Sequence, residues 1–347
     1  MPGLRVRRGR TRPNRIRTTL NKIRVGKALP ILSFPCTSLM GVKTDELVHS
    51  AELQAKGMKA VADRTDAAAS VSMMDLSVEA EAFGAEVRFS PDEVPSVIGA
   101  VVGSPEDADK LAAPAVGAAR TGTFVEAIRQ AKGLITDRPV LAGMIGPFSL
   151  AGRLLDVTKT MLYLVDEPDM VHAVLRRGTD FLIAYAKAFK AAGADGIVMA
   201  EPLAGLISPR MATKFSAPYV KEVVDAVQTA DFPVIYHNCG NNTIKQAGSV
   251  FGIGAAGYHF GNAISMREML AIAPKDAWIM GNVDPAGELA NGTPESVRAA
   301  TLKLMGECCP DYPNFIVSSG CDIPPHAPWA NLDAFFAAVR EYQHNCK

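Results

Sequence analysis

Residues 140–145 read VLAGMI and residues 196–200 read GIVMA, and these two stretches decide the fold. Neither alternates apolar with polar residues, so both faces of each predicted strand are apolar. A strand that is buried on both faces is typical of a parallel sheet covered by helices. We therefore expect an α/β protein with a parallel sheet in its interior.

Six further short apolar runs bring the predicted strands to eight: 30–34, 69–73, 139–144, 196–200, 233–237, 255–258, 278–281 and 315–319. Patterns of helical period lie between or after them, at 45–62, 122–133, 167–190, 209–229, 265–273, 294–306 and 330–342. The long insert 75–138 has room for a hairpin near 85–89. Eight alternating strands and helices predict a single (β/α)8 TIM barrel, with a doubly wound open sheet as the alternative.

The composition excludes several other classes of protein. The chain has 347 residues, of which 48% are hydrophobic and 21% charged, unlike a disordered or collagen-like chain. The longest stretch without a charge, residues 246–266, contains five glycines and several polar residues, so we expect no transmembrane helix. Residues 252–257 match GxGxxG, but a helical pattern precedes them and a strand follows, which is the reverse of the order that a dinucleotide site requires.

Residues 1–27 form a basic arm with ten Lys and Arg and no acidic residue, which leaves 26 basic and 36 acidic residues in 28–347. From Ile16 the spacing predicts a short helix, and 28–347 is the predicted barrel domain. A basic arm can bind nucleic acid or an anionic surface, or act as a transit peptide; we favour a solvated extension, with no nucleic-acid or membrane partner. No secretory signal is recognised, so we expect a cytoplasmic protein whose six cysteines are not a disulfide framework.

Three soft metal ligands stand at the ends of predicted strands: His237, Cys239 and Cys321. A barrel gathers its active site at the carboxyl ends of the strands, so we expect the three on one rim. Two cysteines and one histidine with an open fourth position are typical of a catalytic zinc site. Buried thiols and a core histidine are the alternative, because HxC pairs occur by chance. Cys308 and Cys309 have no nearby histidine and are interpreted as packed thiols.

Acidic and polar side chains at other strand ends are the candidates for substrate binding and catalysis. They are Asp75, Glu79, Glu201, Tyr258, Asn282 and Asp284. A structural loop cap is the alternative for Asp75, Glu201 and Asp284, and a solvated position is the alternative for Glu79 and its neighbour Glu81. For Tyr258 a place in the core is favoured over a contact with a ligand.

Several of these residues lie in stretches that resemble the uroporphyrinogen decarboxylase superfamily, and within it the corrinoid-dependent methyltransferases of the methylcobalamin:coenzyme M type. The stretches are MDLSVEAEAFGA (74–85), GPFSLAGRLL (146–155), EPLAGLISPRM (201–211), HNCG (237–240), MGNVDP (280–285) and SSGCDIPPHAP (318–328). They run in order over nearly the whole chain, from about residue 28 to about residue 340. The resemblance implies a (β/α)8 barrel with a zinc site of the form HxC…C, matched by His237, Cys239 and Cys321.

The resemblance also implies a reaction. Zinc with an open position binds a substrate thiol and keeps it as thiolate at neutral pH. The expected methyl donor is methylcobalamin or a related corrinoid on a partner protein, and the expected acceptor is a small thiol, with coenzyme M the first choice.

Two other activities stay open at this stage. Decarboxylases of the superfamily are expected to bind their tetrapyrrole carboxylates with arginines in the loop after the first strand, but residues 35–41 contain no basic side chain. Asp75 does match an aspartate that the decarboxylases use. A corrinoid:tetrahydrofolate methyltransferase is the other alternative, and the set of His237, Cys239 and Cys321 argues against it.

Overall fold

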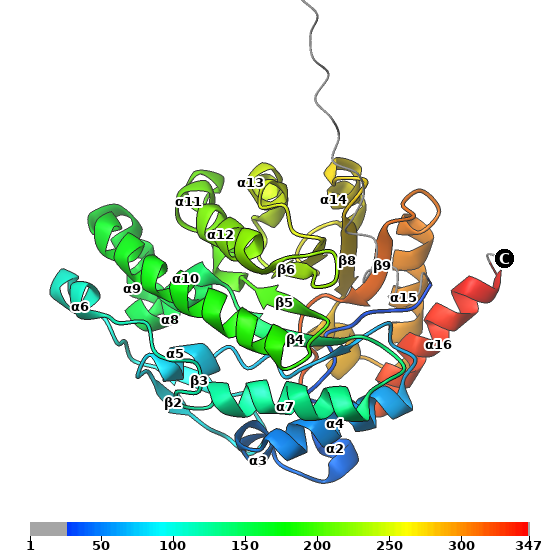
Figure 1. The fold of residues 1–347 in the computed structure, drawn as a ribbon. Coiled ribbons are helices and arrows are strands. Elements are labelled where there is room, and N and C mark those ends of the chain that lie inside the picture. Colours follow the sequence, from blue (N-terminus) through cyan, green and yellow to red (C-terminus); the bar gives the residue numbers. More distant parts are fainter. Residues whose placement is uncertain (1–25, 346–347) are drawn as a thin grey trace, which may run out of the picture.

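The computed structural model describes residues 26–345, and its main sheet consists of parallel strands in chain order (Figure 1). The strands are β1 (Ser70–Val71), β4 (Val140–Ile145), β5 (Gly196–Ala200), β6 (Val234–Asn238), β7 (Gly257–Phe260), β8 (Trp278–Val283) and β9 (Phe315–Ser319). Each is hydrogen bonded to its neighbour in the order β1-β4-β5-β6-β7-β8-β9. The prediction of a barrel-type parallel sheet is therefore confirmed, and the open doubly wound order is not found.

The predicted first strand, 30–34, is not a strand, but the segment just before it fills the eighth position of the barrel. Leu29 donates its N–H to the Val317 carbonyl of β9 (3.0 Å), and Ala28 accepts from Ala68, which precedes β1 (2.7 Å). The segment thus bonds to β9 on one side and to the residues that lead into β1 on the other. It does not continue as a ladder because Pro30 has no N–H and because Ile31 donates instead to the side chain of Ser319 (3.1 Å).

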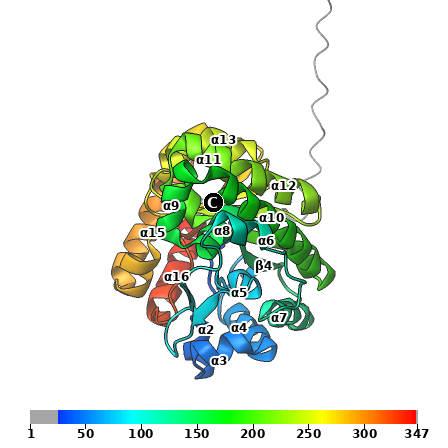
Figure 2. The same ribbon diagram turned by 90° about the vertical axis from the view of Figure 1, so that its left-hand side faces the viewer.

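Helices surround the sheet, as Figure 2 shows from one end of the molecule. Those in the first half of the chain are α2 (Cys36–Met40), α3 (Thr44–His49), α4 (Ala51–Arg64), α5 (Val78–Ala82), α6 (Pro105–Lys110), α7 (Thr121–Leu134), α8 (Pro147–Leu155), α9 (Val157–Asp166) and α10 (Pro168–Ala191). Those in the second half are η1 (Pro202–Leu206), α11 (Pro209–Phe215), α12 (Ala217–Val227), η2 (Thr243–Gln246), α13 (Ala247–Gly252), α14 (Met266–Ile272), η3 (Pro285–Ala290), α15 (Pro294–Cys308) and α16 (Trp329–Asn345).

The strands place alternate residues on two sides, and each side has its own core. The inner side forms a small apolar cluster that includes Val71, Leu141, Val198, Ile235, Met280 and Ile316. A much larger cluster lies between the strands and the helices. This alternation explains why the strands are apolar on both faces, and it leaves the residues at the carboxyl ends of the strands facing the open end of the barrel, which we call the mouth.

The structure corrects several predicted elements. The predicted helix 209–229 is two helices, because Pro218 cannot donate the hydrogen bond that would continue α11. The predicted helix 45–62 breaks at Ser50, whose hydroxyl accepts from Leu53 and caps α4. The expected hairpin is confirmed as the antiparallel pair β2 (Glu86–Arg88) and β3 (Ser96–Ile98). At the GxGxxG match, helix α13 comes before strand β7, as expected.

The predicted basic arm and its helix from Ile16 lie outside the described residues, apart from residues 26 and 27. Within residues 26–345, no helix combines the length and the apolar character that a membrane crossing needs.

Two glycines bring the loops after β5 and β6 into contact. A Cβ on Gly240 would collide with the backbone of Gly205, and a Cβ on Gly205 would collide with the Asn238 side chain and with Gly240. The two backbones therefore touch directly. This contact fixes the path of the chain that follows Cys239.

We expect Gly240→Ala to lower the free energy of unfolding by about 1–3 kcal/mol, because backbone on the other side of the contact cannot move aside as a flexible side chain can. The matched control is Gly248→Ala in α13, where an added Cβ meets no atom within 4 Å. That variant should be neutral, or stabilising by up to about 1 kcal/mol. Denaturant unfolding measures both, and equal effects of the two substitutions would contradict the contact.

A candidate metal centre at the mouth of the barrel

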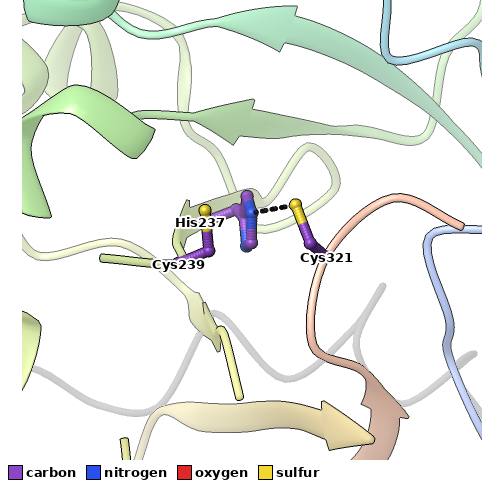
Figure 3. A group of neighbouring side chains, drawn as sticks. All are labelled: His237, Cys239 and Cys321. Carbon is purple, nitrogen blue, oxygen red and sulfur yellow. Dashed lines mark hydrogen bonds between the residues drawn. The ribbon is translucent and has the colours of Figure 1, made fainter. Parts of the chain in front are cut away.

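Three side chains converge at the mouth from two separate strands (Figure 3). His237 lies in β6, Cys239 follows that strand directly, and Cys321 lies two residues after β9. The potential ligand atoms of all three are within 4.8 Å of one another, and the Cys321 sulfur is 3.3 Å from His237 Nε2. His237 is buried and the two thiols are half-buried. One ion could therefore contact all three ligand atoms and still be reached from the mouth.

The loop that carries Cys239 is held by its neighbour Asn238. The side-chain oxygen of Asn238, Oδ1, accepts from the Gly240 N–H (3.0 Å) and from the Thr243 hydroxyl (2.8 Å). Its amide donates to the Tyr236 hydroxyl (3.0 Å). Each side-chain atom of this buried amide has a partner, so the backbone on both sides of Cys239 is fixed before any ion binds.

Behind His237 lies a second histidine. His259 of β7 stands opposite His237 in the register of the sheet, and the two Nδ1 atoms are 2.8 Å apart. The other ring nitrogen of His259 is 2.7 Å from the Ser318 hydroxyl of β9. Burial, and the neighbouring His237, lower the pKa of His259 well below its ordinary value, so this ring is neutral.

The two thiols share their protons unequally. The Cys321 thiol donates toward the Cys239 sulfur, which lowers the pKa of Cys239 and raises the pKa of Cys321. The site can therefore hold one thiolate without an ion. Two thiolates and an imidazole are the ligand set of a catalytic zinc, which keeps a fourth position for substrate.

A buried ion pair forms another part of the mouth. The Asp75 carboxylate accepts from Ser77 and from Arg120, whose Nη1 is 2.5 Å away. Arg120 also donates to Glu81 (2.6 Å). Asp75 and Arg120 are both buried, so each charge depends on the other.

Glu79 and Glu201 are both fully buried, and burial raises the pKa of each to about 7. Glu201 accepts two backbone N–H bonds, from Phe148 and Ser149, at the start of α8. Glu79 accepts from the Ile145 N–H (3.0 Å), while its Oε2 is buried without a hydrogen-bond partner. Both carboxyls therefore change protonation near neutral pH.

The remaining predicted site residues have structural contacts. Tyr258 lies on the outer side of β7, between Phe251 and Phe260, and its hydroxyl donates to the Phe251 carbonyl. It belongs to the core, as the favoured interpretation of this residue had it. Asp284 caps η3 by accepting from Ala286 and Gly287. Asn282 donates to two carbonyls in the loop after β7.

The sequence did not single out His259, Arg120 or Arg153. The predicted sixth strand ended at Tyr258, whereas β7 runs to Phe260, and this difference hid the alternation that turns His259 inward. Arg120 is far from Asp75 in the chain, so no local pattern joins them. Arg153 donates to the Leu76 carbonyl from α8, a helix that was not predicted.

Comparisons with known proteins agree on one family. The model of the uroporphyrinogen decarboxylase (URO-D) family matches residues 30–342. The methylcobamide:CoM methyltransferase MtbA of Methanosarcina mazei is 34% identical over 283 residues, which is 78% of each chain. Uroporphyrinogen decarboxylase of Coxiella burnetii is 28% identical over 311 residues, covering 86% of this chain and 82% of that protein.

A solved structure, described as a methyltransferase from Methanosarcina mazei, has the same fold. It superimposes with a TM-score of 0.83 at 25% sequence identity, and the match covers 94% of this chain and 99% of that one. The likeness of fold therefore extends over nearly the whole chain.

The protonation of Glu79 predicts a pH dependence of stability. Its pKa is about 7 in the folded chain and near 4.5 when unfolded, so the folded chain binds more protons between these values. The contribution of Glu79 to the free energy of unfolding should therefore be fully present below about pH 4.5. It should be lost as the pH rises to about 7. The loss from this one group should be on the order of 3 kcal/mol.

In Glu79→Gln this part of the pH dependence should disappear, because the amide does not ionise. Denaturant unfolding of both proteins from pH 5 to pH 8 measures the difference, and exposed Glu106→Gln is the control. If the difference in stability between the normal chain and Glu79→Gln stays constant over this range, Glu79 does not titrate there.

Proposed function

The chain belongs to the uroporphyrinogen decarboxylase family, and on that basis we propose that it is a methyltransferase that moves a methyl group from a methylated corrinoid to a thiol. The observation that carries the proposal is the convergence of His237, Cys239 and Cys321 within 4.8 Å at the mouth. A relative that matches 78% of the chain is named for methyl transfer between a methylcobamide and coenzyme M. We propose coenzyme M, or a thiol of similar size, as the acceptor.

One imidazole and two thiols are ligands that zinc prefers, and their ligand atoms lie within 4.8 Å of one another. His237 would supply Nε2, and Cys239 and Cys321 would supply their sulfurs. When bound, zinc would lower the pKa of the acceptor thiol and hold its sulfur as a thiolate in the open position. Both cysteines must lose their protons for this, and Cys239 is already disposed to do so because the Cys321 thiol hydrogen bonds to it.

The acceptor thiol also has to release a proton. This proton passes to solvent, which reaches the half-buried thiols of Cys239 and Cys321 through the mouth. The thiolate then attacks the methyl carbon of the methylated corrinoid. The carbon–cobalt bond breaks, a carbon–sulfur bond forms, and the bonding pair stays on cobalt as Co(I).

The donor is a corrinoid, which we propose is carried by a partner protein, so the mouth must be open to a large molecule. The most exposed large apolar side chains on the segments that follow β4 and β5 are Leu162 (61%), Val165 (70%) and Leu206 (54%). Contiguous exposed apolar groups mark surfaces that bind a partner, and Leu162 and Val165, three positions apart in α9, lie on one face of that helix. Their position at the carboxyl end of the strands supports docking over the mouth.

Decarboxylation and methyl transfer to tetrahydrofolate are less well supported. Loop 35–41 carries no arginine, and the buried Arg120 is already paired with Asp75 and Glu81. Carboxylate groups of a tetrapyrrole would thus compete with residues of the chain itself. Tetrahydrofolate presents a nitrogen rather than a thiol. Activation of that nitrogen needs a proton donor, which a site of two thiolates and an imidazole does not supply.

We expect purified protein to contain about one zinc per chain. Cys239→Ala and Cys321→Ala should each lose most of it while circular dichroism stays unchanged, because the two apolar cores do not depend on one ion. The matched control is Cys308→Ala, a buried cysteine of α15 outside the site, which should keep its zinc. Elemental analysis decides, and full zinc in both site variants would refute the assignment.

The reaction is tested by incubating the full chain with methylcobalamin and following the cobalt spectrum without oxygen. Coenzyme M, homocysteine and tetrahydrofolate are offered separately. We expect demethylation with a thiol, accompanied by proton release as the thiol binds, and both should be lost in His237→Ala. Turnover with tetrahydrofolate alone, at an unchanged rate after zinc removal, would contradict the proposed acceptor and the role of the three ligands.

A further inference from the structure

Hydrogen-bond donors and acceptors can be counted along the chain of contacts behind His237. Ser318 donates its hydroxyl hydrogen to the Leu29 carbonyl (2.7 Å), since a carbonyl oxygen can only accept. The Ser318 oxygen must then accept in its second contact, with His259 Nε2 at 2.7 Å. His259 is therefore protonated on Nε2.

The same count continues to His237. A neutral imidazole has one N–H, so His259 Nδ1 carries a lone pair. This atom is 2.8 Å from His237 Nδ1, which must be the donor of that hydrogen bond. His237 Nε2, the atom that faces Cys321, then needs no proton and is free to bind a metal ion with its lone pair.

We propose that His259 and Ser318 are positioning residues that set the tautomer and ring orientation of His237 for metal binding. This inference rests on the proposed function, because it concerns the same metal centre. The chain of contacts runs from the Leu29 carbonyl through Ser318 and His259 to His237, and ends at the metal-facing nitrogen.

The surroundings of His259 favour its neutral form. His259 is 1% exposed and Ser318 is fully buried, and the electrostatic interactions of His259 include no carboxylate. A ligating histidine commonly donates its second N–H to a carboxylate or a backbone carbonyl, and such partners contribute about 10- to 100-fold to metal affinity. Here a neutral histidine takes that place. It orients His237 without adding negative charge beside the two thiols.

The last acceptor in this chain of hydrogen bonds, the Leu29 carbonyl, belongs to the backbone of the barrel. Leu29 belongs to the segment that joins the edge strands, and it also bonds to Val317 of β9. The side chain of Ser319, the next residue, accepts from the Ile31 N–H instead, and Ser319 meets His259 only through its backbone carbonyl. Two adjacent serines of one strand therefore bond to the same segment, but only the side chain of Ser318 connects it to His259. This difference provides a matched pair of variants.

The first experiment determines which ring nitrogen of each histidine carries the proton. In the full chain labelled with ¹⁵N-histidine, two-bond ¹H–¹⁵N correlation spectra give the tautomer of each ring, and His259→Asn identifies the His259 signals. We expect His259 to be neutral with its proton on Nε2, both in metal-free protein and with added zinc. A proton on Nδ1 of His259 would overturn the proposal.

The second experiment measures zinc affinity by competition with a chromophoric chelator. His259→Phe removes the acceptor and should weaken zinc binding about 10- to 100-fold. His259→Asn keeps an oxygen that can accept from His237 and should recover most of the affinity. Ser318→Ala should weaken binding several-fold, whereas Ser319→Ala should leave it unchanged at a similar cost in stability.

The outcomes separate this inference from the proposed function. If the normal chain binds no zinc, the metal centre fails, and the spectra of metal-free protein still decide the tautomer of His259. If the normal chain binds zinc but His259→Phe and Ser318→Ala bind it equally well, the centre stands and the positioning role is refuted. Equal losses in Ser318→Ala and Ser319→Ala would refute it as well.

Discussion

The register between β6 and β7 places His237 directly opposite His259, and the rest of the site depends on this pairing. Parallel strands expose alternate residues to the interior, so a shift of one residue would bring Tyr258 inward and turn His259 toward the helices. The same alternation puts Ser318 of β9 on the inner side. A single sheet geometry thus aligns three residues that the chain separates by up to 81 positions.

The loops after β6 and β9 place the two cysteines beside His237. Direct contact of Gly240 with Gly205, together with the fully bonded Asn238 side chain, holds Cys239 beside His237, while Cys321 arrives from the other side of the barrel. Three buried carboxyls, Asp75, Glu79 and Glu201, surround the mouth in different states. Asp75 is paired with Arg120, and burial leaves the other two with pKa values of about 7. The mouth therefore combines a soft ligand set with groups that exchange protons near neutral pH.

Much of this arrangement could be predicted from the sequence, because buried parallel strands have a distinct apolar pattern. β5 and β9 have the predicted bounds, and the three ligand residues were recognised from their places at strand ends. Residues whose role depends on distant partners could not be recognised. Arg120 pairs with Asp75 across 45 positions, and His259 is defined by a strand that extends two residues past its predicted end. A strand was expected at 30–34, but the segment 28–31 closes the barrel without forming a ladder, because Pro30 has no N–H.

The central claim is that the acceptor sulfur binds at the site of His237, Cys239 and Cys321. X-ray absorption at the zinc edge of the loaded full chain, before and after addition of coenzyme M, tests it most directly. We expect two sulfur ligands and one imidazole nitrogen without the thiol, and three sulfur ligands with it. An unchanged sulfur count at a saturating concentration of a thiol that the enzyme methylates would contradict the account.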